Sequence, residues 1–103
     1  RESDGFQWVN ANDGDRSIFS FIRRDETKKK NLLFVINFTP MERPDYRVGV
    51  PRRGKYHLIL DQSHGAYAAS QMPVYTAKKG ECDGLPFSFA YPLAPYGTAI
   101  FRF

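Results

Sequence analysis

The sequence predicts an all-β fold, an antiparallel Greek-key-like β-sandwich of about seven or eight strands. Apolar and polar residues alternate along many short segments, and Pro or Gly separates these segments at close intervals. No segment carries apolar residues at helical spacing. Many short strands with frequent turns are typical of sandwiches and barrels. The expected strands are residues 6–10, 16–24, 31–39, 46–50, 56–61, 72–76, 85–93 and 97–103.

The segment 16–24 differs from the others because both of its faces are bulky and apolar, with Ile18 and Ile22 on one side and Phe19 and Phe21 on the other. A strand of an isolated sandwich needs only one apolar face. Either this strand is central and covered on both sides, or its second face meets another domain.

The segment 31–39 shows strong alternation. Its first face is wholly apolar and its second turns polar toward the end: the first has Leu32, Phe34, Ile36 and Phe38, and the second has Leu33, Val35, Asn37 and Thr39. The pattern predicts a strand whose second face is half covered. The polar residues 25–30 before it read as the tip of a hairpin.

Two later segments alternate as strands that line a core. Their predicted core residues are Tyr56, Leu58 and Leu60 in the first, and Leu85, Phe87, Phe89, Tyr91 and Leu93 in the second. Between the strands in the middle of the chain, Pro40, Pro44, Pro51 and Gly54 mark strand ends, because Pro removes a ladder donor and Gly permits positive φ.

Length and composition predict one globular domain over residues 1–103, with residues 1–10 as a lead-in from a preceding domain. The chain has 42% hydrophobic and 25% charged residues, which excludes a disordered tail. It is too short for a TIM barrel of roughly 250 residues. The start at Arg1 lacks signal and transit-peptide patterns, so we expect it to lie inside a longer polypeptide.

The same composition bears on location. No apolar run approaches the roughly 20 residues that a membrane span needs. The single Cys82 cannot form an intramolecular disulfide. We therefore expect a cytoplasmic protein without a membrane partner.

The acidic residues predict turns rather than catalysis. They stand at predicted turns or strand ends, where Asp caps or solvates the backbone, and nothing near them predicts a shifted pKa. These residues are Asp13, Asp15, Asp25, Glu26, Asp61, Glu81 and Asp83. We expect no catalytic residue in this chain.

Nucleophilic and metal chemistry have little support. Asp61, Ser63 and His64 supply the residue types of a hydrolase triad, but triads are assembled from separate segments, so coincidence is favoured. His57, His64 and Cys82 lack the close pairs of a zinc site, and no phosphate-binding glycine motif is present. The sequence predicts no metal and no cofactor.

The formal net charge of +4 raises the question of polyanions. Residues 46–57 interleave Arg and Lys with Tyr, as single-strand nucleic-acid binders do. However, Tyr56 belongs to a predicted core face and residues 52–55 read as a turn, so we expect no nucleic-acid partner. Flat rings near predicted loops are candidates for stacking on sugars, and the candidate substrate-binding residues are Trp8, Tyr67 and Tyr75.

The order of motifs resembles the C-terminal region of bacterial 1,4-α-glucan (glycogen) branching enzymes. Four motifs carry this resemblance, namely residues 5–9, 12–24, 33–40 and 46–56, and the match extends from about residue 5 to residue 60. The tail is similar in character, with Leu-Pro-Phe-Ser-Phe at 85–89 and Leu-Ala-Pro-Tyr-Gly at 93–97. Residues 65–72 depart from the glycine-rich turn usual in that family, so the conformation of this loop is open.

The resemblance implies a C-terminal all-β domain of the α-amylase superfamily that packs on a TIM-barrel catalytic domain. The parent would cleave an α-1,4-glucan and transfer it to a 6-hydroxyl through a retaining carboxylate pair, which lies on the barrel and not in this segment. Docking on the barrel would cover the second face of residues 18–22, and the segment around Trp8 would be the hinge. We expect the isolated chain to fold while exposing an apolar patch of roughly several hundred Å².

Three functions remain open. The first is a non-catalytic accessory domain that stabilises the barrel and contacts α-glucan. The second is an independent carbohydrate-binding sandwich, and the third is a basic nucleic-acid-binding barrel, for which binding would depend steeply on salt.

Overall fold

The computed structural model describes residues 6–10, 17–25 and 30–103, and it confirms an antiparallel all-β fold. In this part of the chain there is no α-helix, only a short 3₁₀ turn at Ala69–Gln71. The strands are β1 (Phe6–Asn10), β2 (Ile18–Asp25), β3 (Lys30–Asn37), β4 (Arg43–Val50), β5 (Gly54–Asp61), β6 (Gly65–Ala66), β7 (Val74–Cys82), β8 (Leu85–Leu93) and β9 (Thr98–Arg102).

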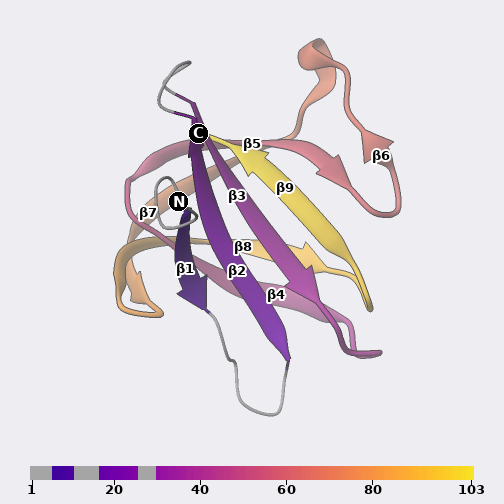
Figure 1. The fold of residues 1–103 in the computed structure, drawn as a ribbon, viewed down its shortest axis with the longest axis horizontal. Coiled ribbons are helices and arrows are strands. Elements are labelled where there is room, and N and C mark those ends of the chain that lie inside the picture. The colour runs from indigo at the N-terminus through magenta and orange to yellow at the C-terminus, as the bar shows by residue number, and fades with distance from the viewer. Residues whose placement is uncertain (1–5, 11–16, 26–29) are drawn as a thin grey trace.

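The strands form one curled sheet in the order β1-β2-β3-β9-β5-β7-β8-β4, with the short β6 paired to β5. Strand β7 turns the corner, since its first half pairs with β5 and its second half with β8. The sheet thereby folds into two layers. Figure 1 shows β1, β2, β3 and β9 in front, crossing β8 and β4 behind them.

The core lies between the two layers and is rich in aromatic rings. Phe101 of β9 is fully buried, and its ring lies 5.1 Å from the rings of both Phe89 and Tyr91 of β8. Tyr56 of β5 meets Phe89 at 5.3 Å. These contacts confirm the predicted core positions Tyr56, Leu58, Phe89, Tyr91 and Leu93. Because aromatic side chains bury a large apolar area each, they suit a domain this small.

The predicted faces of β3 are exchanged in the structure. Leu33, Val35 and Asn37, the face expected to be half covered, are 0%, 0% and 1% exposed. The wholly apolar face is the partly exposed one, and Phe38 at its end is 59% exposed. Alternation gives two faces but not which of them is inside, so a strand apolar on both sides left the choice open.

A bulge in β5 corrects a second prediction. Leu58 pairs with Phe101, but Leu60 rather than Ile59 pairs with Ile100, so one extra residue is inserted between them. The bulge turns Leu60 away from the core, where the alternation had placed it, and turns Asp61 inward opposite the buried Ala99. Bulges re-aim side chains in this way.

Asn37 is a buried polar residue that joins two loops to β3. Its Nδ2 donates to the carbonyls of Met41 and Ala94, each at 3.0 Å. Its Oδ1 accepts from the Thr39 amide at 2.9 Å and the Thr39 hydroxyl at 2.7 Å. All four hydrogen-bonding positions of the side-chain amide are therefore used, as burial requires.

The hairpin between β7 and β8 is longer than expected. β7 continues to Cys82 because a two-residue Asp83-Gly84 turn, with φ of +52° and +78°, connects it directly to β8. Asp-Gly with both residues at positive φ is the turn that matches strand twist. Among the other predicted turns, Asp25 and Lys30 are paired across β2 and β3, while residues 26–29 lie outside the described residues.

The beginning of the chain is described only in part. The backbone of β1 pairs with β2, and Trp8 lies opposite Phe21. The side chain of Trp8 and residues 1–5 and 11–16, with Asp13 and Asp15, lie outside the described residues. No helix in the described ranges is long and apolar enough to cross a bilayer.

Candidate functional site

A cavity of about 230 Å³ lies at the end of the sandwich where β5 and β8 end and β9 begins. It brings together two predicted sugar-stacking residues, Tyr67 and Tyr75, with two residues that were not predicted for a site, Asp61 and Tyr91. Apolar walls complete it, from Leu58, Leu93, Pro73 and Pro92. We call this the end cavity.

Asp61 organises the turn beside the end cavity. Its Oδ1 accepts hydrogen bonds from the Ser63 hydroxyl at 2.9 Å and from the His64 amide at 2.7 Å. Burial alone would raise the pKa of Asp61, but these bonds and that of the Tyr67 hydroxyl outweigh it and lower the pKa. The turn-capping prediction is confirmed, whereas the prediction of no pKa perturbation is wrong for this residue.

Tyr67 is held in place by three neighbours. Its amide donates to the carbonyl of Ile59, the bulge residue, at 2.9 Å. Its hydroxyl donates to Asp61 Oδ2 at 2.8 Å, and this hydrogen bond is the main cause that raises the pKa of the phenol. The His64 ring stacks on the Tyr67 ring, with centroids 3.8 Å apart and planes 4° from parallel. The departing loop 65–72 is thus anchored to β5 through Tyr67.

Tyr75 and Tyr91 line the inner wall of the end cavity. Their rings meet edge-on at 5.2 Å, and both pack edge-on against Phe101. Burial is the main cause that raises the pKa of each phenol, and the charge of Asp61 adds to it. Within the described residues neither hydroxyl has a hydrogen-bond partner, although Tyr91 is only 6% exposed.

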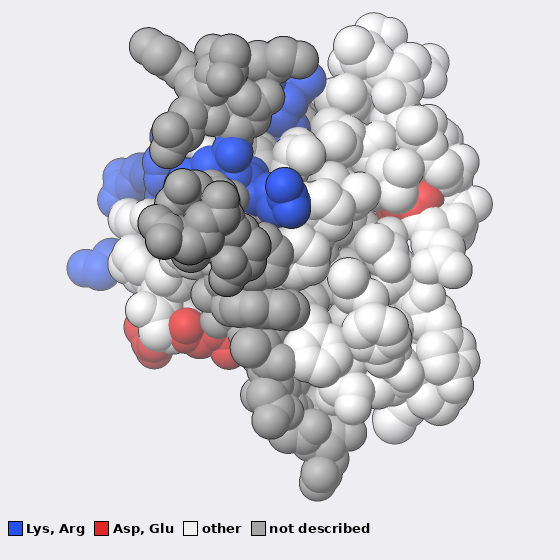
Figure 2. All heavy atoms as spheres, in the orientation of Figure 1, with Lys and Arg blue, Asp and Glu red and all other residues white. Residues whose placement is uncertain are grey.

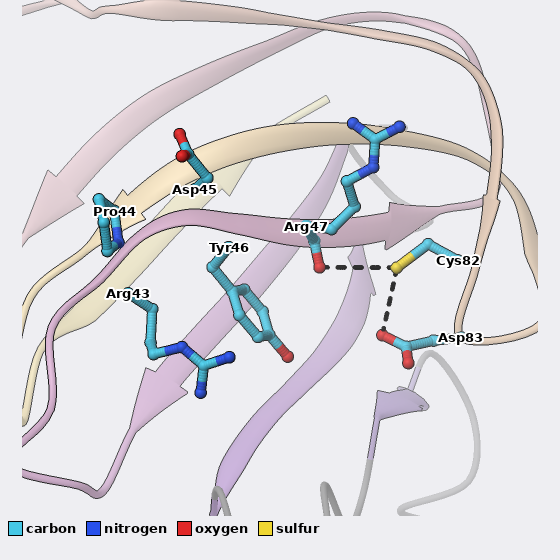
Figure 3. Close-up of a pocket in the computed structure, with 7 residues that line it drawn as sticks. All are labelled: Arg43, Pro44, Asp45, Tyr46, Arg47, Cys82 and Asp83. Carbon is cyan, nitrogen blue, oxygen red and sulfur yellow. Dashed lines mark hydrogen bonds between the residues drawn. The ribbon is translucent and has the colours of Figure 1, made fainter.

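A larger cavity, of about 460 Å³, lies beside the edge strand β4. Figure 3 shows the Cys82 thiol pointing toward the Arg47 carbonyl oxygen at 3.6 Å and Asp83 Oδ2 at 3.8 Å. Burial first, and then the charge and hydrogen bond of Asp83, raise the pKa of Cys82 to about 11. The thiol is therefore protonated at neutral pH and is a poor nucleophile.

The strand pair at this cavity is close-packed. A Cβ at Gly49 of β4 would overlap the carbonyl of Cys82, so only glycine fits there. Tyr46, also at this cavity, is 7% exposed and belongs to the core.

A third cavity, of about 370 Å³, has three basic residues among its lining residues, Arg53, Lys78 and Lys79. Two arginines of the β4–β5 turn lie over aromatic rings, Arg52 at 5.2 Å from the Phe103 centroid and Arg53 at 5.5 Å from the Phe87 centroid. Tyr56 is 1% exposed and is not available for base stacking. Its hydroxyl donates to the Arg52 carbonyl at 2.7 Å, and this bond ties the β4–β5 turn to the core.

The residues weighed for a triad or a metal site are placed as follows. His64 contacts Asp61 through its backbone amide, while its ring faces Tyr67. Within the ranges that the structure describes, no group of three His, Cys, Asp or Glu residues is placed to hold a metal ion.

The outer surface of β2, β3, β9 and β5 is apolar, and we call it the outer face. Cross-strand register aligns Phe21, Phe34, Ile100 and Leu60 in one row across these four strands. All of its members are at least partly exposed, and they are Phe19, Phe21, Leu32, Phe34, Ile36, Phe38, Leu60 and Ile100. Figure 2 shows basic groups over the upper ends of β2 and β3, and no charged group over β9 and the lower part of β3.

Packing on this face is aromatic. Phe21 and Phe34 stack with centroids 4.8 Å apart and planes 5° from parallel, and Phe19 meets Phe38 edge-on at 5.5 Å. The structure confirms that β2 is apolar on both sides, with Ile18 and Ile22 fully buried and Phe19 and Phe21 partly exposed. Contiguous exposed apolar surface of this kind marks interaction sites.

A two-layer antiparallel fold with a closed core and a second apolar face defines the class of protein, an all-β domain. The chain belongs to the family described as the alpha amylase C-terminal all-beta domain, which matches residues 8–103.

Individual relatives agree with this family. The chain is 46% identical over 102 residues to the 1,4-alpha-glucan branching enzyme GlgB of Butyrivibrio fibrisolvens, covering 96% of the chain and 16% of that enzyme. It is 39% identical over 104 residues to GlgB of Aquifex aeolicus (strain VF5), with the same coverage of both chains. It is 33% identical over 104 residues to GlgB 1 of Clostridium perfringens (strain SM101 / Type A), covering 98% of the chain and 15% of the relative. The resemblance seen in the sequence motifs is confirmed, and the chain spans about one-sixth of the length of these relatives.

Proposed function

We propose that this chain is the non-catalytic C-terminal domain of a 1,4-α-glucan branching enzyme, and that it stabilises the catalytic barrel by docking on it. The observation that carries the proposal is the outer face, which is apolar across four strands although the core on the other side of the same strands is already closed. A protein gains nothing in solution from a second apolar face, but gains hydrophobic free energy when a neighbour covers it.

The proposed occupant is the remainder of the same enzyme. The chain spans 16% of the Butyrivibrio relative, so a full-length homologue has a large further part to supply the covering surface. Charge favours such a contact. Arg23 and Arg102 stand at one end of the outer face, in register on either side of Leu32, while the row through Phe34 carries no charged residue. An apolar centre with charges at its margin is typical of protein interfaces.

The chemistry would belong to the parent. Branching enzymes of this superfamily transfer a glucan chain through a retaining pair of carboxylates held at the ends of barrel strands. In this proposal the chain contributes stability and shape to that barrel, and the parent enzyme is cytoplasmic.

The test is to weaken the outer face in the full-length enzyme. Phe34→Ser combined with Ile100→Ser should lower the melting temperature and the branching activity of the parent. Ala90→Ser, on the exposed side of β8, is the matched control and should change neither. A parent that keeps its stability and activity with both outer-face substitutions would contradict the docking role.

A further inference from the structure

We propose that the end cavity binds one glucosyl residue of an α-glucan chain. The choice of α-glucan among sugars rests on the proposed function, whereas the argument for a neutral polyhydroxyl ligand rests on the cavity itself.

The polar groups of the cavity suit a ligand with several hydroxyls. Each sugar hydroxyl both donates and accepts, and the cavity offers both partners. Asp61 Oδ2 accepts one hydrogen bond, from Tyr67, and retains capacity for another. Tyr75 and Tyr91 present hydroxyls that have no partner within the described residues. Each of these hydroxyls can both donate a hydrogen bond to a ligand hydroxyl and accept one from it.

The apolar walls suit the other side of a sugar ring. Leu58, Leu93 and Pro73 line the cavity together with the ring of Tyr67. A pyranose carries C–H groups on its faces and hydroxyls at its edge, so it matches walls of this kind with polar groups at one side. The volume of about 230 Å³ lies below the roughly 300–1,000 Å³ of sites for drug-sized ligands, which favours one ring over a longer segment.

The geometry of the cavity is set before any ligand arrives. The bulge at Ile59 turns Asp61 inward, and the Tyr67 amide holds the carbonyl of that bulge residue. The Tyr67 hydroxyl then fixes the second oxygen of Asp61. A site whose groups are already oriented loses less conformational entropy on binding.

Charge excludes the main alternatives. Asp61 is the single ionisable acid or base among the lining residues apart from the tyrosine phenols, so phosphate and carboxylate ligands would be repelled. Its carboxylate already accepts three hydrogen bonds, which reduces what it offers to a cation. A neutral ligand remains.

The experiment is a titration of the chain with maltoheptaose, followed by calorimetry and by amide chemical shifts. We expect shifts at Asp61, Tyr67 and Tyr91. Tyr91→Phe keeps the ring and removes the hydroxyl, and should weaken binding about threefold to tenfold, the loss of one neutral hydrogen bond. Tyr67→Ala should abolish measurable binding. The matched control is Tyr56→Phe, which removes a buried phenol hydroxyl at the opposite end of β5 and should leave the affinity unchanged.

Each contrary outcome overturns the proposal. The first is no binding of maltoheptaose by the wild-type chain. The second is wild-type affinity in both Tyr91→Phe and Tyr67→Ala. The third is a Tyr56→Phe variant that is weakened as much as Tyr91→Phe. Cellohexaose bound as tightly as maltoheptaose would overturn the assignment to α-glucan. Melting temperatures of all variants establish that each is folded. Failure here leaves docking on the barrel intact, because the outer-face substitutions test that role separately.

Discussion

The Tyr67 amide and the Ile59 carbonyl are joined by a hydrogen bond of 2.9 Å, and this bond ties the loop after β5 to the bulge within it. Without the inserted residue, the alternation would turn Leu60 toward the core and Asp61 outward. With it, Asp61 faces the cavity between the layers and caps the turn at Ser63 and His64. One backbone irregularity therefore positions both the carboxylate and the ring of the candidate site.

The lowered pKa of Asp61 predicts a pH dependence of stability. The folded-state pKa lies below the unfolded value, so the stabilisation is present above that value and is lost as pH falls through the folded pKa. The melting temperature of the wild type should exceed that of Asp61→Asn near pH 6, and the difference should shrink below about pH 4. Asp45→Asn, at an exposed position of β4, is the control. A difference that stays constant from pH 6 to pH 3 would contradict the prediction.

The exchanged faces of β3 predict unequal losses of stability when two adjacent leucines are truncated. Leu33→Ala should lower the free energy of unfolding by about 2–5 kcal/mol, because Leu33 is fully buried and its truncation leaves a cavity. Leu32→Ala on the outer face should cost below about 1 kcal/mol in the isolated chain. Urea titration of both variants measures the difference, and similar costs would show that the faces are assigned wrongly.

The four hydrogen bonds of the Asn37 side chain predict a large loss of stability when it is replaced by Ala. Asn37→Ala removes four hydrogen bonds and leaves the Met41 and Ala94 carbonyls without that donor, so the free energy of unfolding should fall by at least about 2 kcal/mol. Asn31→Ala, at the other end of β3 and partly exposed, is the matched control and should cost much less. Equal losses in urea titrations would mean that Asn37 does not hold the two loops.

The raised pKa of Cys82 predicts slow alkylation. With a pKa of about 11, the thiolate fraction at pH 8 is smaller than that of an ordinary thiol by on the order of a hundredfold. Iodoacetamide should therefore react much more slowly with the folded chain than with the chain in urea. The folded-state rate should keep rising with pH well beyond pH 9. Equal rates in the folded and unfolded chain would rule out the shift.

Much of the fold follows from local pattern. The alternation in residues 85–93 places Phe89, Tyr91 and Leu93 correctly, because one face of β8 is apolar and the other carries Pro, Ser and Ala. In β3 both faces are apolar, so the pattern contains no choice between them. The decision depends on the partner strands, where Leu33 meets Ile22 and Phe101 in the core.

The candidate site was predictable only in part. Tyr67 and Tyr75 stand near loops, and this marks them as available for a ligand. Asp61 and Tyr91 are distant in sequence and meet because β5 carries a bulge and β8 packs across from it. A bulge at Ile59 leaves no mark in an apolar run such as Leu58-Ile59-Leu60. The length of β7 was signalled by the Asp-Gly pair, which identifies a tight hairpin.

The central proposal, that the outer face lies against the remainder of a branching enzyme, is tested most directly by thiol protection. Phe34→Cys and Ala90→Cys, each in a Cys82→Ser background, would be labelled with a maleimide in the 103-residue chain and in the full-length enzyme. We expect the Phe34→Cys variant to react readily in the chain and to be protected at least tenfold in the full-length enzyme, while the Ala90→Cys variant reacts alike in both. Equal labelling of the Phe34→Cys variant in the chain and the full-length enzyme would contradict the proposal.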